Sequence, residues 1–107
     1  MSDRALTDLT KRVRDFAEAR DWERYHTPKN LAMALAGEVG ELLEIFQWLT
    51  PQQAADVMGG VRADDVEDEL ADVVIYLVRL ADVLDVDLIA AARAKLIRNE
   101  ERFPPGG

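Results

Sequence analysis

The segment LAGEVGELLEIFQW, residues 35–48, decides the fold, because its apolar residues recur at the spacing of a helix. On a helical wheel Glu38 and Glu41 lie at the edge of the apolar arc, whereas Glu44 points toward solvent. Residues three apart are neighbours on a helix surface. We therefore do not interpret Glu38 and Glu41 as ordinary solvent-exposed acids.

Two glycines, Gly37 and Gly40, interrupt the same helical segment. A glycine inside a helix costs about 1 kcal/mol relative to alanine. Their presence therefore predicts the close approach of another element or of a ligand. Close packing between helices would explain them equally well.

Capping signals divide the rest of the chain into helices. Thr27 and Pro28 supply a hydroxyl N-cap and a proline at the first helical position, and the TPQQ sequence at 50–53 is a capping box. The predicted long helices cover residues 3–20, 28–49, 62–85 and 87–102, and a short helix begins at Pro51 and stops before Gly59. No segment shows the alternation of a strand. We expect an all-α protein, an antiparallel four-helix bundle with a short extra helix between the second and third long helices.

The bulk composition fits one domain over residues 1–107, and a hydrophobic content of 49% is enough for a core. The chain has no cysteine, which excludes disulfides, a thiol nucleophile and a thiolate metal site. A net charge of −8 argues against nucleic acid as a partner, although divalent cations could join an acidic protein to phosphates. No stretch resembles a signal peptide or a bilayer span, so we expect a cytoplasmic protein without a membrane partner.

A second acidic pair lies in the sequence VEDELADVVIYLVRL. Glu69 lies beside the apolar arc of the third predicted helix, and Asp72 is one turn further on. Tyr76 lies between these two acids on the wheel, and its hydroxyl needs a polar partner. Each of two helices therefore offers one pair of carboxylates at positions i and i+3.

Four carboxylates that face one another would repel unless they were protonated or bridged by cations. Ligands that are all oxygen suit Mg²⁺ or Mn²⁺, with waters and substrate phosphates in the remaining positions. A di-iron site would need an E-x-x-H pattern, and His26, the only histidine, is not placed to supply one. From the residues alone, a metal site and a structural network of ion pairs remain equally good interpretations.

The acidic blocks, in this order along the chain, resemble the all-α nucleoside triphosphate pyrophosphohydrolases, the MazG and dCTP pyrophosphatase group, and most closely its single-domain dCTP pyrophosphatase branch. The family pattern is E-x-x-E, a gap, and E-x-x-D, which here is EVGE at 38–41 and ELAD at 69–72 with 27 residues between them. The segment KLIRNEERFP resembles the family pattern K-x-x-x-N-x-x-R-Y-P, with Phe103 in place of tyrosine. The resemblance covers residues 14–104.

This resemblance implies an enzyme that hydrolyses a nucleoside triphosphate, dCTP or a related pyrimidine nucleotide, to the monophosphate and pyrophosphate. It implies that Mg²⁺, with Mn²⁺ as an alternative, is bound by four acids: Glu38, Glu41, Glu69 and Asp72. Glu38 or Glu41 would be the catalytic base. The residues implied to contact substrate are Trp22, Trp48, Tyr76, Lys95, Asn99 and Arg102. Val13 stands where vertebrate members carry a histidine associated with the nucleotide, so the base preference stays open.

The third predicted helix is apolar on almost every side in VVIYLVRLADVL, which one chain of this length would leave partly uncovered. We expect a homodimer at least, and the resemblance implies a homodimer or a homotetramer. Two alternatives remain. The same chemistry could act on dUTP or on a broad set of triphosphates, or the chain could be a helical interaction module without catalysis.

Overall fold

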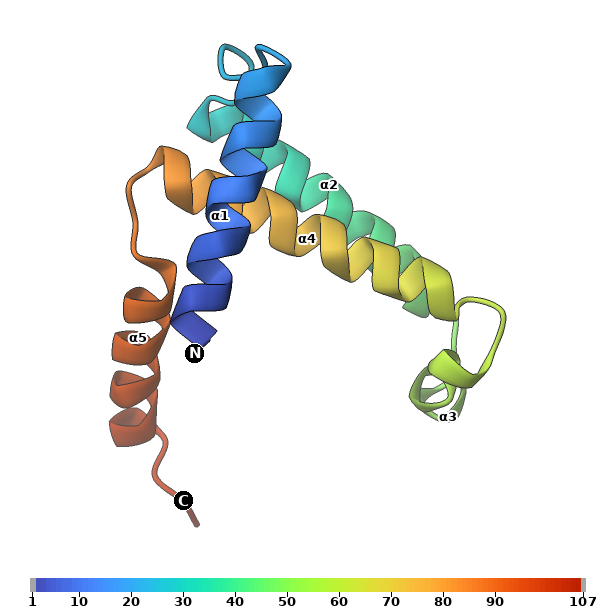
Figure 1. Ribbon diagram of the computed structural model, residues 1–107. Helices are drawn as coiled ribbons and strands as arrows, with labels where there is room; N and C mark the ends of the chain where they lie inside the picture. The colour runs from blue at the N-terminus through green and yellow to red at the C-terminus, as the bar shows by residue number, and fades with distance from the viewer. Residues whose placement is uncertain (1, 107) are drawn as a thin grey trace.

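The computed structural model describes residues 2–106, apart from the side chain of Ser2, and these residues form only helices and connections (Figure 1). The elements are α1 (Ser2–Ala19), α2 (Pro28–Phe46), α3 (Pro51–Ala55), the 3-10 turn η1 (Val57–Gly59), α4 (Ala63–Val83) and α5 (Leu88–Arg102). The predicted all-α class, with four long helices and a short extra one, is confirmed. No helix in this part of the chain combines the length and the apolar character that a bilayer crossing requires.

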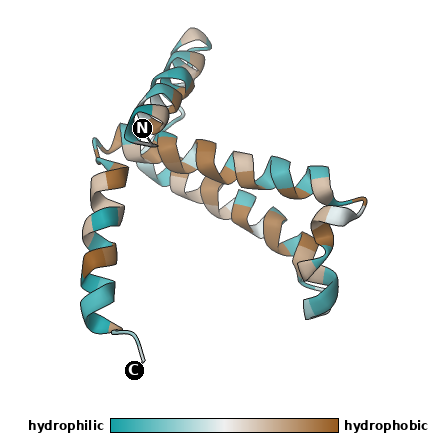
Figure 2. Cartoon of the chain, turned by 60° about the horizontal axis from the view of Figure 1, so that its bottom comes forward, coloured by the Kyte–Doolittle hydropathy of each residue, from teal (hydrophilic) through white to brown (hydrophobic). Residues whose placement is uncertain are grey.

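Helices α2 and α4 pack side by side in opposite directions and form the centre of the molecule, and α1 crosses α4 (Figure 1). The buried apolar residues come from these three helices: Ala17, Leu31, Ile45, Val66, Val78 and Ala81. This core is small. Apolar residues recur along much of the α2–α4 pair (Figure 2), and several of those on α4, including Leu70, Val74 and Leu77, remain exposed.

The predicted caps are present. Thr27 Oγ1 accepts a hydrogen bond from the backbone N–H of Asn30 at 3.2 Å and begins α2. The box before α3 is complete, because Thr50 Oγ1 accepts from Gln53 N at 3.2 Å and the Gln53 side chain accepts from Thr50 N at 2.9 Å. Helix α2 ends at Phe46, earlier than the predicted boundary at Leu49, and the backbone N–H of Gln47 donates to the carbonyl of Leu43 at its end.

Helices α1 and α4 end in the same way. Asp21 and Asp85 follow them with positive φ values of 55° and 56°, a left-handed conformation that aspartate tolerates better than most residues. After α1, the backbone N–H of Trp22 donates to the carbonyl of Ala17 at 3.0 Å, which turns the chain back along the helix. The connection that holds Trp22 is therefore folded against the end of α1.

Helix α5 extends away from the α2–α4 pair and lies near the N-terminal end of α1 (Figure 1). None of its residues is buried, and the apolar side chains of Leu96 and Ile97 are exposed. Arg93 connects it to α1 through an ion pair with Asp3, at 3.0 Å. The fourth long helix therefore forms where it was predicted, but it does not pack along the other three long helices of the same chain.

The glycines of α2 have no close neighbour within the chain. A Cβ atom built on Gly37 or on Gly40 would meet no other atom within 4 Å, apart from the helix itself. Close packing against another helix of the same chain, one of the two predicted explanations, is therefore wrong.

Candidate metal and nucleotide site

Three of the predicted acids meet where α2 and α4 lie side by side. Glu38 and Glu41 come from consecutive turns of α2, Glu69 comes from α4, and each offers a carboxylate oxygen within 4.8 Å of the others. The i, i+3 spacing directs the α2 pair to one side of its helix, and the antiparallel packing brings Glu69 opposite it. Three acids that are distant in the sequence thus form one cluster.

The fourth predicted acid, Asp72, lies one turn beyond Glu69 on α4 and is half-buried. It is not one of the three residues whose oxygens lie within 4.8 Å of one another. Its charge nevertheless acts on the cluster, because it helps to raise the pKa of both Glu38 and Glu69. Asp72 therefore adjoins the cluster in this structure.

The carboxyl group of Glu69 is the most perturbed of the cluster. Burial, followed by the neighbouring carboxylate of Glu41 and the charges of Glu38 and Asp72, raises its pKa to about 7. Its Oε2 atom is buried and has no hydrogen-bond partner. The pKa of Glu38 is raised as well, first by burial and then by the charges of Glu41 and Asp72. A divalent cation would satisfy a buried acceptor that has no hydrogen-bond donor.

A hollow of about 330 Å³ opens beside the cluster. Its lining residues are mainly acidic: Glu41, Glu44, Ile45, Arg62, Asp65, Asp68 and Glu69. Glu44 was predicted to point toward solvent, and it is exposed, as is Asp68. Residues three apart stay on one side of a helix, so Glu44 also borders this open hollow beside Glu41.

The donors of this site fit a hard divalent cation. Each carboxylate of the cluster offers only oxygen, and no cysteine exists in the chain. Mg²⁺ and Mn²⁺ prefer such ligands, and they keep coordination positions for water and phosphate. Of the nearby cations, Arg62 donates instead to Asp65, at 2.7 Å. The residues present therefore fit a metal ion better than a closed network of ion pairs.

The predicted aromatic residues lie at different places. Tyr76 is half-buried on α4, one turn beyond Asp72. Trp22 lies in the α1–α2 connection, folded against the end of α1, and is 42% exposed. Trp48 follows the end of α2 and is 86% exposed. Since α2 has 19 residues, its two ends are separated by about 27 Å, and one chain does not bring both tryptophans together.

The predicted polar residues of the C-terminal segment, Lys95, Asn99 and Arg102, all lie on α5. Lys95 and Arg102 are exposed, and Asn99 is half-buried. The guanidinium of Arg102 lies over the ring of Phe103, 5.1 Å from its centroid. Because α5 extends away from the α2–α4 pair, the structure does not bring these side chains to the acidic cluster of the same chain (Figure 1).

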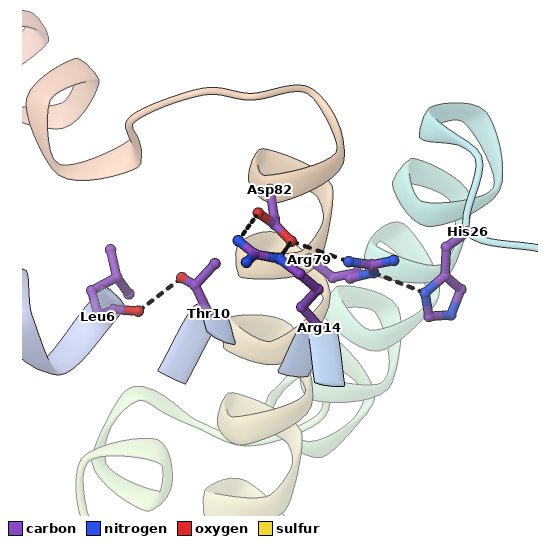
Figure 3. A network of polar contacts seen from close by, with 6 residues as sticks. All are labelled: Leu6, Thr10, Arg14, His26, Arg79 and Asp82. Atoms are coloured by element: carbon purple, nitrogen blue, oxygen red, sulfur yellow. Dashed lines mark hydrogen bonds and ion pairs between the residues drawn. The ribbon is translucent and has the colours of Figure 1, made fainter. Parts of the chain in front are cut away.

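A polar network that the sequence did not suggest joins α1, α4 and the α1–α2 connection (Figure 3). Asp82 accepts two hydrogen bonds from Arg14, at 2.8 and 2.6 Å, and one from Arg79, at 3.1 Å. Arg79 also donates to Nδ1 of His26 at 3.1 Å. Arg14 and Arg79 together hold the pKa of Asp82 below its usual value.

Comparison with known proteins identifies the family of this chain. The model of the MazG-like family matches residues 34–105, which include the cluster. The chain is 44% identical over 100 residues to dCTP pyrophosphatase 1 of Homo sapiens, covering 92% of this chain and 59% of that protein. For the Bos taurus protein of the same name the identity is 41% over 104 residues, covering 96% and 62%. The chain thus spans about three-fifths of the length of these curated relatives.

The same likeness extends to three dimensions. A crystal structure of a pyrophosphatase from Archaeoglobus fulgidus superimposes with a TM-score of 0.88 at 42% sequence identity, covering 94% of this chain and 93% of that one. The likeness to these proteins, in sequence and in structure, therefore covers almost the whole chain. This protein belongs to the MazG-like family.

Proposed function

We propose that this protein is a Mg²⁺-dependent pyrophosphohydrolase that converts a nucleoside triphosphate, dCTP or a related pyrimidine nucleotide, to the monophosphate and pyrophosphate. The observation that carries the proposal is the meeting of Glu38, Glu41 and Glu69, with an unpartnered buried oxygen on Glu69. Family membership and the pyrophosphatase relatives support the reaction class, and the mammalian relatives support dCTP. Such an enzyme would clear unwanted nucleotides.

Glu38, Glu41 and Glu69, joined by Asp72, would hold Mg²⁺, with Mn²⁺ as an alternative. A bound divalent ion supplies positive charge that neutralises the phosphate oxygens as the anhydride breaks. The acidic cluster alone would repel a triphosphate, so the charge of the protein itself makes a cation necessary for binding.

Glu38 or Glu41 would take the proton of the attacking water. The water oxygen forms a new bond to phosphorus, the bond between the α and β phosphates breaks, and pyrophosphate leaves with the electron pair of that bond. Glu38 and Glu41 both offer a carboxylate oxygen at the cluster, so either side chain could take this proton.

The nucleoside end of the substrate would be held by Trp22, Trp48 and Tyr76, and the phosphates by Lys95, Asn99 and Arg102. One chain does not bring these groups together, because the tryptophans flank opposite ends of α2 and α5 stands apart. We therefore propose a homodimer or homotetramer in which a second copy completes each site. The exposed apolar residues along α4 are a surface that such a copy would cover.

A panel of nucleotides tests the reaction. The protein is incubated with Mg²⁺ and each common ribo- or deoxynucleoside triphosphate, and the products are separated by chromatography. We expect equimolar monophosphate and pyrophosphate, with dCTP or a related pyrimidine nucleotide turned over fastest. Preference for dUTP, or equal turnover of many triphosphates, would keep the chemistry and change the substrate. No turnover of any nucleotide would contradict the proposal and favour an interaction module.

The assembly is tested separately by sedimentation. We expect a dimer or a tetramer at concentrations at which turnover is measured. A monomer that keeps full activity would contradict the proposal that a second copy completes the site.

A further inference from the structure

Arg79, on α4, is the only buried charged residue among those that the structure describes, with 6% of its surface exposed. It donates from Nη1 to Asp82 and from Nε to Nδ1 of His26, each at 3.1 Å (Figure 3). His26 lies in the α1–α2 connection, 53 residues away in the sequence. A single guanidinium thus joins α4 to that connection.

His26 in turn contacts Trp22. Because Nδ1 of His26 accepts a hydrogen bond from Arg79, the ring is neutral and carries its proton on Nε2. The ring packs edge to face with Trp22, with centroids 6.1 Å apart. On another side Trp22 packs in the same manner with Phe16 of α1, at 5.5 Å. Two rings therefore fix the orientation of Trp22, although 42% of its surface stays open to solvent.

The surroundings of Phe16 suggest what the open part of Trp22 could meet. Phe16 lines an apolar hollow of about 260 Å³ between α1 and α4, together with Val13 and Ile75. Trp22 does not itself line this hollow, but its ring contacts Phe16, which does. Stacking on an exposed aromatic ring is a general way to bind a nucleobase.

The fold does not need a buried charge at this position. Replacing a buried ionic group by an apolar side chain of similar volume is often neutral for stability or even favourable. Without Arg79, Asp82 would keep its two hydrogen bonds from Arg14, so no carboxylate would be left unpaired. The bond from Nε of Arg79 to His26, in contrast, has no substitute among the contacts of His26 described here, and it holds the ring in one orientation.

We propose that Arg79 is a positioning residue, which acts through His26 to hold the ring of Trp22 beside the apolar hollow, ready to stack on the base of the substrate. This inference rests on the proposed function. The hydrogen-bond partners of Arg79 are His26 and Asp82, and neither belongs to the acidic cluster. Its loss should therefore weaken nucleotide binding and leave the chemical step intact.

The test compares the Arg79→Met variant with the wild-type protein and with Arg98→Met, which changes an exposed arginine on α5. Both tryptophans are labelled with 5-fluorotryptophan, and a Trp48→Phe sample identifies the fluorine resonance of Trp22. We expect Arg79→Met to shift that resonance without nucleotide present. We also expect KM to rise about fivefold or more, as a partial loss of stacking would give, with kcat and the Mg²⁺ affinity unchanged. Arg98→Met should resemble the wild type in every measurement.

A Trp22 resonance and a KM that both match the wild type would overturn the proposal. Should Arg79→Met fail to fold, His26→Phe takes its place, because it keeps a ring beside Trp22 and removes the Nδ1 acceptor. The same two changes are then required, and wild-type values would again overturn the proposal. Absence of turnover by the wild-type protein would instead refute the proposed function, while the fluorine resonance would still decide whether Arg79 positions Trp22.

Discussion

The raised pKa of Glu69 predicts that metal binding depends on pH in a range where ordinary carboxylates no longer titrate. A cation competes with the proton for a carboxylate ligand. With a pKa of about 7, the deprotonated fraction of Glu69 changes about tenfold between about pH 6 and about pH 8. The dissociation constant for Mg²⁺ should therefore be about tenfold larger at the lower pH, and binding there should release about one proton per ion.

Isothermal titration calorimetry with MgCl₂ measures both quantities, if each titration is repeated in two buffers with different enthalpies of ionisation. Glu69→Gln should bind Mg²⁺ more weakly and lose most of the pH dependence, because only the raised pKa of Glu38 then remains. Glu67→Gln, which removes an exposed acid two residues away on α4, should behave like the wild type. Equal affinities at both pH values in the wild type, or the same pH dependence in Glu69→Gln, would refute the reasoning.

Three further predictions concern catalysis and stability. Glu41→Gln should abolish pyrophosphate release but keep the wild-type circular dichroism spectrum, since the Glu41 side chain is exposed; normal rates would remove it from the mechanism. Leu31→Ala should lower the free energy of unfolding in urea by about 2–5 kcal/mol, because Leu31 is 1% exposed. A loss well below this range would contradict the prediction and would mean that the surrounding side chains close the cavity. The lowered pKa of Asp82 means that its pairing stabilises the fold above the ordinary carboxyl pKa and is lost as the pH falls through the lower, folded-state value. Acid unfolding followed by circular dichroism should therefore begin at a higher pH in Arg14→Met, and an unchanged midpoint would contradict this.

Local features of this fold could be predicted from the sequence because their causes are local. A hydroxyl before a proline marked the start of α2, and a glutamine three residues after Thr50 marked the capping box, since each cap involves only a few neighbouring residues. The acidic pairs were predicted for the same reason. Their i, i+3 spacing depends on a single helix, and antiparallel packing of α2 and α4 was enough to bring three acids together.

Contacts between distant segments could not be predicted. The hydrogen bond from Arg79 to His26 spans 53 residues, and nothing in either local sequence marks it. The position of α5 was also missed, because amphipathic spacing predicts a helix but does not say whether its apolar side packs on the same chain or on another. The open space around Gly37 and Gly40 could not be predicted for the same reason, since the pattern does not say which chain or ligand lies close to these glycines.

The central claim is that Glu38, Glu41 and Glu69 bind a divalent ion that meets the phosphates of a nucleotide. A crystal structure with Mn²⁺ and a non-hydrolysable dCTP analogue tests it most directly, because Mn²⁺ is located by its anomalous scattering. We expect a Mn²⁺ peak in contact with oxygens of all three glutamates and with the triphosphate. A bound nucleotide whose phosphates lie elsewhere, with no anomalous peak between α2 and α4, would contradict the claim.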